Sequence, residues 1–160
     1  MQLSFFKHCH DRSSLLLSQC FPRQRAQMIS IVIVNWNGHA DTVECLASLL
    51  HSKVACEVVV CDNRSEASSF EAIRHWCGNH LNAVATVDPL PARAEEALCW
   101  RGTAGIAHLS LLRLRENYGF AGGNNAGIEY ARSREPEFVF LLNNDTLVEP
   151  TTLNAFIARM

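Results

Sequence analysis

Two stretches decide the fold: residues 29–38, ISIVIVNWNG, and residues 56–65, CEVVVCDNRS. Each begins with an apolar run rich in β-branched residues and ends in polar turn residues. A short apolar run closed by turn residues is typical of a strand that is buried on both faces of a sheet. Because helical apolar spacing follows each strand, the sequence predicts β–α–β units and a parallel sheet.

Two helices are expected after these strands. Asp41 and Glu44 have the spacing of a capping box, and Ser68 and Glu71 repeat it before the second helix. Apolar residues at helical spacing then mark one face of each helix. These residues are Val43, Leu46, Ala47 and Leu50 in the first helix, and Ile73, Trp76 and Cys77 in the second.

The middle of the chain carries a weaker signal. A third strand is expected at 83–87. Residues 88–107 hold two prolines, an Ala/Glu-rich piece and two glycines, which favours a loop with a short helix. This stretch has the character of an insertion.

Stronger elements follow in the last third. The sequence predicts strands at 109–114 and 138–142, with a helix between them that begins in a glycine-rich run and ends near Arg132. Pro150 suits the first turn of a closing helix. Leu153, Phe156, Ile157 and Met160 would share one side of that helix.

Composition bounds the class of protein. The 160 residues correspond to about one domain, with 48% hydrophobic and 19% charged residues, as in ordinary globular chains. No apolar run approaches the roughly 20 residues of a membrane-spanning helix, so we expect no transmembrane segment. A net charge of −2 provides no global field for nucleic acid, and we expect no nucleic-acid partner.

Residues 1–27 differ from the rest of the chain. They carry Lys7, Arg12, Arg23 and Arg25 against Asp11, a net charge of +3. We interpret 1–27 as a disordered tail or as an extension from a start codon assigned too early, since Met28 directly precedes the first strand. A mitochondrial presequence is the alternative. The domain would then comprise residues 28–160.

The seven cysteines are odd in number and include no Cys-x-x-Cys pair. This pattern fits neither a zinc ribbon nor a disulfide framework, and it favours reduced thiols in the cytoplasm. Four of them fall in apolar patterns, where reduced cysteine behaves as a small hydrophobe. These are Cys45, Cys56, Cys61 and Cys77.

Polar clusters follow three of the predicted strands, at 35–37, 62–65 and 143–145. In open α/β sheets, ligands bind beyond the carboxyl ends of the strands, where the strand order reverses. Each cluster alone is explained by turn chemistry, because Asn and Asp favour loops. Three clusters at equivalent strand ends favour a shared polar site.

Two features near these clusters allow a functional and a structural interpretation. The glycine-rich run 119–127 offers either close backbone approach to a ligand or tight helix–sheet packing, and the adjacent Asn124 and Asn125 favour binding. Asp145 is the one carboxylate of its cluster. It would hold Mg²⁺ or Mn²⁺ together with substrate phosphates, or it would serve as a turn or cap residue.

These motifs, in this order, resemble those of family 2 glycosyltransferases, and most closely their rhamnosyltransferase-like group. The resemblance rests on ISIVIVNWNG, CDNRS, NYGFAGGNNAGI and FVFLLNNDTLVEP, and it extends from about residue 28 to the C-terminus. It implies a GT-A fold: a Rossmann-like, mostly parallel sheet with helices on both faces, here incomplete at the C-terminus.

The resemblance also implies a nucleotide-diphosphate sugar, UDP- or dTDP-linked, as donor. Trp36 would then lie against the base or ribose, Asp62 would accept a hydrogen bond from the base, and residues 119–125 would form a loop near the ribose, diphosphate or sugar. The implied nucleotide-sugar-binding residues are Val34, Asn35, Trp36, Asn37, Asp62, Gly119, Phe120, Gly122, Gly123, Asn124, Asn125, Asn143 and Asn144.

Asn143-Asn144-Asp145 occupies the position of the family's Asp-x-Asp motif, with Asp145 as the implied Mg²⁺ or Mn²⁺ ligand. Here the sequence departs from the motif, since both earlier positions are Asn. The family transfers the sugar with inversion to a hydroxyl of a glycan or lipid-linked acceptor in cell-surface polysaccharide or glycan synthesis. Its catalytic base is expected beyond Met160, and no residue here matches it.

The sequence is compatible with two classes of function and disfavours a third. The first is a cytoplasmic glycosyltransferase that works at the inner face of the membrane. The second is a truncated, non-catalytic module that binds a nucleotide sugar without transferring it. A nicotinamide-dependent oxidoreductase is disfavoured, because no dinucleotide fingerprint follows the first strand.

Overall fold

The computed structural model describes residues 29–85, 89–102 and 105–159. The predictions for residues 1–28, including the tail, the presequence and the start at Met28, lie outside these ranges. The elements, in chain order, are β1 (Ile29–Asn35), α1 (His39–Leu50), β2 (Cys56–Asp62), α2 (Ala67–His80), β3 (Asn82–Val84), β4 (Ala94–Arg101), β5 (Ile106–Leu114), α3 (Gly119–Arg132), β6 (Phe138–Asn143) and α4 (Thr152–Ile157).

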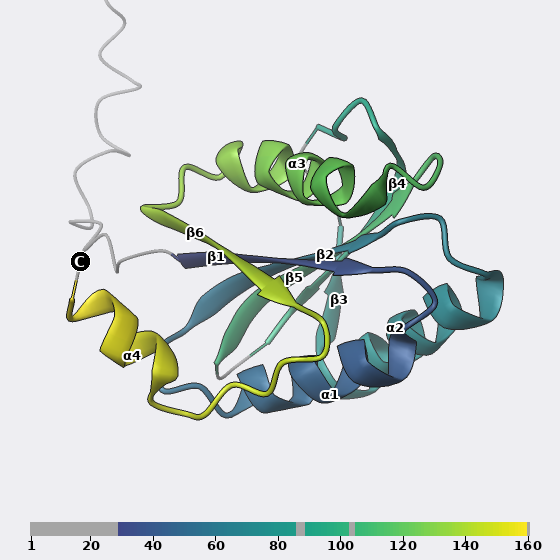
Figure 1. The fold of residues 1–160 in the computed structure, drawn as a ribbon. Coiled ribbons are helices and arrows are strands. Elements are labelled where there is room, and N and C mark those ends of the chain that lie inside the picture. The colour runs from purple at the N-terminus through teal and green to yellow at the C-terminus, as the bar shows by residue number, and fades with distance from the viewer. Residues whose placement is uncertain (1–28, 86–88, 103–104, 160) are drawn as a thin grey trace, which may run out of the picture.

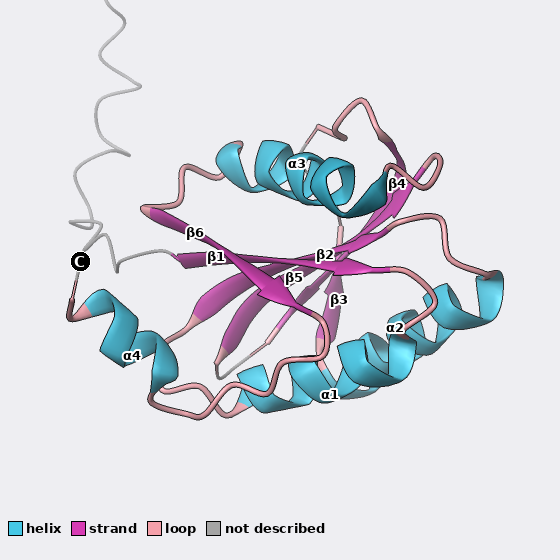
Figure 2. Cartoon of the chain, in the orientation of Figure 1, coloured by secondary structure: helices cyan, strands magenta, loops and turns pink. Residues whose placement is uncertain are grey.

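The six strands form one mixed sheet in the order β3-β4-β5-β2-β1-β6 (Figure 2). β5, β2, β1 and β6 run parallel, whereas β4 is antiparallel to both β3 and β5. The β1 and β2 strands are almost wholly buried, as their unbroken apolar runs predict.

Helices cover both faces of the sheet. α3 lies on one face, and α1, α2 and α4 lie on the other (Figure 1). Alternate residues of β1 point to opposite faces of the sheet. Ile31 and Ile33 pack toward α1 and α2, whereas Val32 packs toward α3. The predicted α/β class, with a mostly parallel sheet and helices on both faces, is confirmed.

Both capping-box predictions are wrong. α1 begins at His39 after Gly38, and α2 begins at Ala67 after Glu66, and neither helix has a side-chain cap. A tertiary contact sets the start of α2, because Asn37 Oδ1 accepts a 2.8 Å hydrogen bond from the N–H of Glu66, the residue before this helix. Each helix begins earlier than the spacing of its polar residues suggests.

The loop with a short helix predicted for 88–107 is also wrong. This stretch contains β4, which forms an antiparallel pair with β5. Its sequence, AEEALCWR, contains no β-branched residue, so pairing with β5 and burial of Cys99 and Trp100 override weak local propensity. The predicted strand at 83–87 corresponds to the shorter β3, and residues 86–88 lie outside the described ranges.

The prediction for the closing helix is confirmed in part, and the prediction that four cysteines are buried is confirmed in full. α4 buries Leu153 and packs Ile157 on the core, but Phe156 is 49% exposed, and Met160 is not described. Cys45, Cys56, Cys61 and Cys77 are buried and form no disulfide, and the same is true of Cys99. In the described ranges, no helix combines the length and apolar character needed to cross a membrane.

Candidate site at the carboxyl ends of the strands

The carboxyl ends of β1, β2 and β6 meet at one edge of the sheet. Asn35 at the end of β1 is aligned with Asp62 at the end of β2, and Val34 is aligned with Asn143 at the end of β6. Successive parallel strands are added on one side of β1 and then, with β6, on the other. The strand order therefore reverses between β1 and β6, where open α/β sheets bind ligands.

A series of hydrogen bonds, here named the strand-end relay, joins these three strand ends. Asn144 Nδ2 donates to Thr42 Oγ1 at 3.2 Å, and Thr42 Oγ1 donates to Asn35 Oδ1 at 3.0 Å. Asn35 Nδ2 then donates to Asp62 Oδ1 at 2.9 Å. The relay fixes the ends of β6, β1 and β2 relative to one another.

The inner members of the relay are fully enclosed by protein. Asn35 and Asp62 have no exposed surface. Asp62 Oδ2 accepts the Ser65 N–H at 3.1 Å, and Asn35 Nδ2 also faces the hydroxyl oxygens of Ser65 and Ser69. Buried polar groups need such partners, so these two predicted ligand residues act here as the scaffold of the site.

Asn63 joins β2 to the start of α3. It is 2% exposed, and its Nδ2 donates to Asn117 Oδ1 at 2.8 Å and to the Gly119 carbonyl at 3.1 Å. Its Oδ1 accepts the Tyr118 N–H at 2.9 Å. The sequence marks Asn63 only as a member of the polar cluster 62–65 and gives it no role of its own. It does not mark Thr42, because a single Thr in a helix carries no motif.

Residues 119–125 do not form the predicted loop; they are the first two turns of α3. Gly119 has φ +68, a left-handed conformation that favours glycine. A Cβ at Gly123 would lie 2.9 Å from Val34 Cγ1, so this glycine permits close helix–sheet packing. Asn124 is 5% exposed and donates to the Phe120 carbonyl at 3.0 Å.

Close contacts also explain Gly122, which lies against Tyr118 at the start of the same helix, and Gly127, which lies against the sheet. A Cβ at Gly122 would lie 2.5 Å from Tyr118 Cβ, and one at Gly127 would lie 2.4 Å from Val32 Cγ1. The packing interpretation of the glycine-rich run is therefore the one that its geometry supports at these positions.

Other predicted residues face solvent at this edge. Trp36 is 61% exposed and Phe120 is 63% exposed, and Asn125 and Asn143 are exposed as well. Asn37 is also exposed, in a left-handed conformation with φ 56. These are the side chains that a ligand could reach directly.

Asp145 follows β6 in a turn closed by the Thr146 N–H, which donates to the Asn143 carbonyl at 3.2 Å. Its carboxylate is exposed and makes no hydrogen bond with a described residue. The charge of Asp145 nonetheless reaches α1: burial and this charge together raise the pKa of the Cys45 thiol to about 11.

The side chains around Asp145 offer few ligands to a metal ion. In the described part of the chain, no group of three or more His, Cys, Asp or Glu residues is placed to hold a metal. An exposed, uncommitted carboxylate beside amide oxygens suits Mg²⁺ or Mn²⁺ only when phosphate oxygens and water complete the coordination. The residues thus fit an ion that arrives with a phosphorylated ligand.

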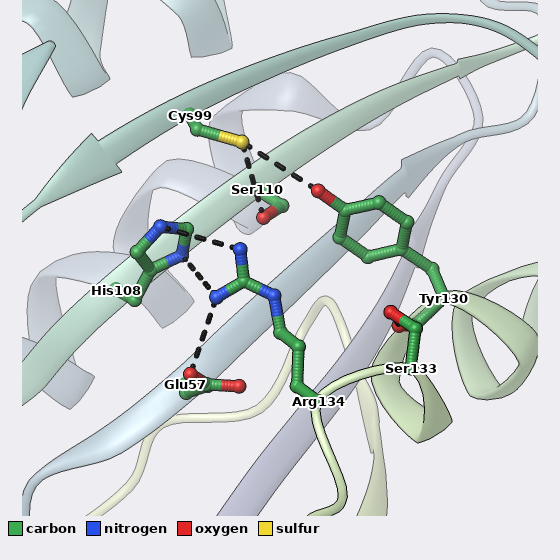
Figure 3. Close-up of polar contacts among 7 residues, drawn as sticks. All are labelled: Glu57, Cys99, His108, Ser110, Tyr130, Ser133 and Arg134. Atoms are coloured by element: carbon green, nitrogen blue, oxygen red, sulfur yellow. Dashed lines mark hydrogen bonds and ion pairs between the residues drawn. The ribbon is translucent and has the colours of Figure 1, made fainter. Parts of the chain in front are cut away.

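A second polar cluster lies at the opposite ends of the strands, under the end of α3 (Figure 3). Arg134 forms a 3.2 Å ion pair with Glu57, and its guanidinium also contacts both ring nitrogens of His108. The Arg134 and Glu57 side chains are each 14% exposed. This cluster joins the end of α3 to β2 and β5.

A shallow cavity of about 290 Å³ lies elsewhere, between α2 and the β3–β4 edge of the sheet. Arg74, Val84, Leu98 and Trp100 are among its lining residues, and none of the predicted site residues lines it. Because its walls come mainly from apolar side chains and backbone, it offers little polar chemistry to a substrate.

No family model and no curated protein matches the chain. Among solved structures, the chain is similar to the crystal structure of S. aureus TarS 1–349, with a TM-score of 0.55 and 19% sequence identity. The match covers 82% of this chain but 31% of the TarS chain, so this chain spans about a third of that structure. The matched part of the chain thus shares the α/β fold of that structure.

Proposed function

We propose that the chain is the donor-binding part of a glycosyltransferase of the family 2 type, in its rhamnosyltransferase-like group. The donor is a UDP- or dTDP-linked sugar, and the acceptor is a hydroxyl of a glycan or a lipid-linked glycan. The fold and the motifs ISIVIVNWNG, CDNRS, NYGFAGGNNAGI and FVFLLNNDTLVEP support this proposal. The buried cysteines form no disulfide, which suits a reducing cytoplasm, where the enzyme would work at the inner face of the membrane.

The strand-end relay is the observation that carries the proposal. It fixes three strand ends at the point where the strand order reverses, and it leaves Trp36, Phe120 and Asp145 open to solvent around them. Exposed aromatic rings can stack on a base or a sugar, and an exposed carboxylate can face a metal-bound phosphate. Such an edge suits a nucleotide diphosphate better than an apolar ligand.

Each part of the donor has a candidate partner. Trp36 would stack on the base or ribose. The Gly119 N–H donates to Asn117 Oδ1 at 2.8 Å, and the other first-turn N–H groups of α3 would face the diphosphate. Asp145 would hold Mg²⁺ or Mn²⁺ beside the phosphates. When bound, the ion would neutralise charge that develops on the nucleotide diphosphate leaving group.

In the proposed reaction, the acceptor oxygen bonds to the anomeric carbon as the bond from that carbon to the diphosphate oxygen breaks. Attack from the opposite side inverts the anomeric centre. A base must take the proton of the acceptor hydroxyl. The residues described here would bind the donor, orient it and stabilise the leaving group.

Titration calorimetry of the full chain with UDP and with dTDP, each with and without Mn²⁺, tests the donor site. We expect binding that Mn²⁺ strengthens, and Asp145→Asn should remove the Mn²⁺ effect. Glu149→Gln is the matched control, since Glu149 is also exposed and lies on the same segment. The absence of heat with both nucleotides would refute the proposal.

A module that binds a nucleotide sugar without transferring it is the second candidate. It is favoured by the side chains that face solvent at the candidate site, because Trp36, Phe120 and Asp145 all have proposed roles in donor binding and none is assigned as the base. Transfer of sugar by the chain to an added acceptor would exclude this candidate. Binding without turnover under the same conditions would support it.

A further inference from the structure

One face of α1 holds the segment that carries Asp145. Thr42, Cys45 and Ser48 recur every third residue on α1, and we name them the α1 row. Each member meets a different point of residues 143–148. Nothing in the motifs of the sequence marks these three residues.

The first contact is the outer step of the strand-end relay. Asn144 Nδ2 donates to Thr42 Oγ1 at 3.2 Å and to the Gly38 carbonyl at 3.3 Å. The Gly38 carbonyl also accepts the Thr42 N–H at 3.0 Å, but both oxygens here face a donor from position 144. An amide supplies this donor, whereas a carboxylate would place negative charge against a carbonyl oxygen. The neutral Asn144 beside Asp145 thus has a structural reason.

Two further contacts secure the rest of the segment. The Cys45 thiol points its Sγ at the Asn143 carbonyl, 3.9 Å away, and Ser48 Oγ accepts the Val148 N–H at 3.0 Å. Thr42 and Cys45 are fully buried, and Val148 is 8% exposed. The turn with Asp145 at its exposed corner is therefore held on both sides by buried or half-buried contacts.

We propose that the α1 row, and Thr42 above all, acts as a positioning element for Asp145, which sets the carboxylate for a divalent cation that accompanies a nucleotide diphosphate. This inference rests on the proposed function. Thr42 touches neither cation nor nucleotide; it acts through Asn144 on the residue that follows. Outer contacts of this kind commonly change metal affinity by about 10- to 100-fold when they are removed.

Thr42→Val tests the proposal, because it removes the hydroxyl and keeps the shape of the side chain. The measurement is the ratio of UDP or dTDP affinity with Mn²⁺ to that without it, for the full chain. We expect Thr42→Val to reduce the Mn²⁺ enhancement by about tenfold or more, beyond any change in cation-free affinity that follows from the loss of its contact with Asn35. Thr42→Ser retains the hydroxyl and should restore the enhancement.

General destabilisation needs its own control. Gly127→Ala perturbs packing under α3, far from the α1 row, and should lower stability without changing the Mn²⁺ ratio of the folded protein. Hydrogen exchange of the Thr146 and Val148 amides, measured without ligand, should accelerate in Thr42→Val and not in Thr42→Ser.

The outcomes separate the two proposals. A wild-type chain that binds no nucleotide would refute the proposed function, and this inference with it. A wild-type chain that shows Mn²⁺-dependent binding, together with a Thr42→Val variant that keeps the full Mn²⁺ enhancement, would overturn the positioning role alone.

Discussion

The side-chain amide of Asn35 donates a 2.9 Å hydrogen bond to the carboxylate of Asp62, and neither residue has any exposed surface. The contact crosses from β1 to β2 at their carboxyl ends, where the two residues are aligned in the parallel register. Thr42 Oγ1 donates to the other end of the same amide at 3.0 Å. One amide thus joins two strands and a helix beneath the candidate site.

Asn35→Ala should lower the free energy of unfolding by about 2 to 3 kcal/mol, because it leaves the buried Asp62 carboxylate short of a donor. The Thr42 hydroxyl keeps an acceptor, since it also lies 3.0 Å from the Gly38 carbonyl. Urea unfolding at neutral pH measures the change. Asn125→Ala, an exposed position on α3, should cost less than about 0.5 kcal/mol. Equal stability of the two variants would show that the Asn35 contact is dispensable.

Gly127→Ala should destabilise the fold by about 1 to 3 kcal/mol. The added Cβ would lie 2.4 Å from Val32 Cγ1 and 2.8 Å from Cys61 Sγ, so α3 would have to move away from the sheet.

Gly78→Ala is the matched control in another helix. A Cβ there meets nothing within 4 Å, and alanine favours the helix by up to about 1 kcal/mol. We therefore expect Gly127→Ala to lower the melting temperature and Gly78→Ala to raise it or leave it unchanged. The same sign for both would contradict the packing role of Gly127.

Arg134→Met should cost about 3 kcal/mol, because removal of one partner leaves the mostly buried Glu57 carboxylate uncompensated. Arg134 also lies over the Tyr130 ring, with 5.7 Å from Cζ to the ring centroid. Chemical denaturation at neutral pH provides the measurement.

Arg74→Met is the comparison for Arg134→Met, since the Arg74–Glu71 pair on α2 is about half exposed on both sides. An exposed pair of this kind contributes less than about 1 kcal/mol. If both arginine variants were equally stable, the cluster in Figure 3 would have no stabilising role.

Alkaline pH should destabilise the protein beyond the effect of its surface charges. Burial raises the pKa of four thiols and of the Tyr130 hydroxyl, so these groups stay protonated in the folded state at a pH where they ionise in the unfolded state. The stability that they contribute is complete below their ordinary pKa values of 9.0 and 10.0 and is lost as the pH rises toward the folded values. The folded pKa values are about 11 for Cys45 and about 12 for Cys56, Cys61, Cys77 and Tyr130.

Urea midpoints between pH 8 and pH 11 measure this loss. Cys77→Ala removes one of the buried thiols, so its midpoint should fall less steeply with pH than that of the wild type. A wild-type midpoint that stays constant to pH 11 would contradict the assignment of these groups as buried and neutral.

Local sequence determined the backbone of the fold. Unbroken apolar runs specify β1 and β2 as buried parallel strands. A strand with apolar side chains on both faces is stable only in a sheet that is covered on both faces. The polar residues that end β1, β2 and β6 could be expected at one edge, since parallel strands in register align their carboxyl ends. The strand β6 and the end of α3 were predicted within a residue, but the start of α3 was not, because the glycine-rich run 119–125 was expected to form a loop.

Tertiary structure alone decided the rest. β4 forms because β5 offers a ladder of hydrogen bonds to a segment whose own propensity is weak, and the start of α2 follows the contact of Asn37 with Glu66. The division of the polar residues into a buried scaffold, Asn35 and Asp62, and an exposed rim, Trp36 and Asp145, depends on which partners lie within hydrogen-bonding distance. Thr42 could not be found from the sequence, because its hydroxyl matters only after folding brings Asn35 and Asn144 to either side of it.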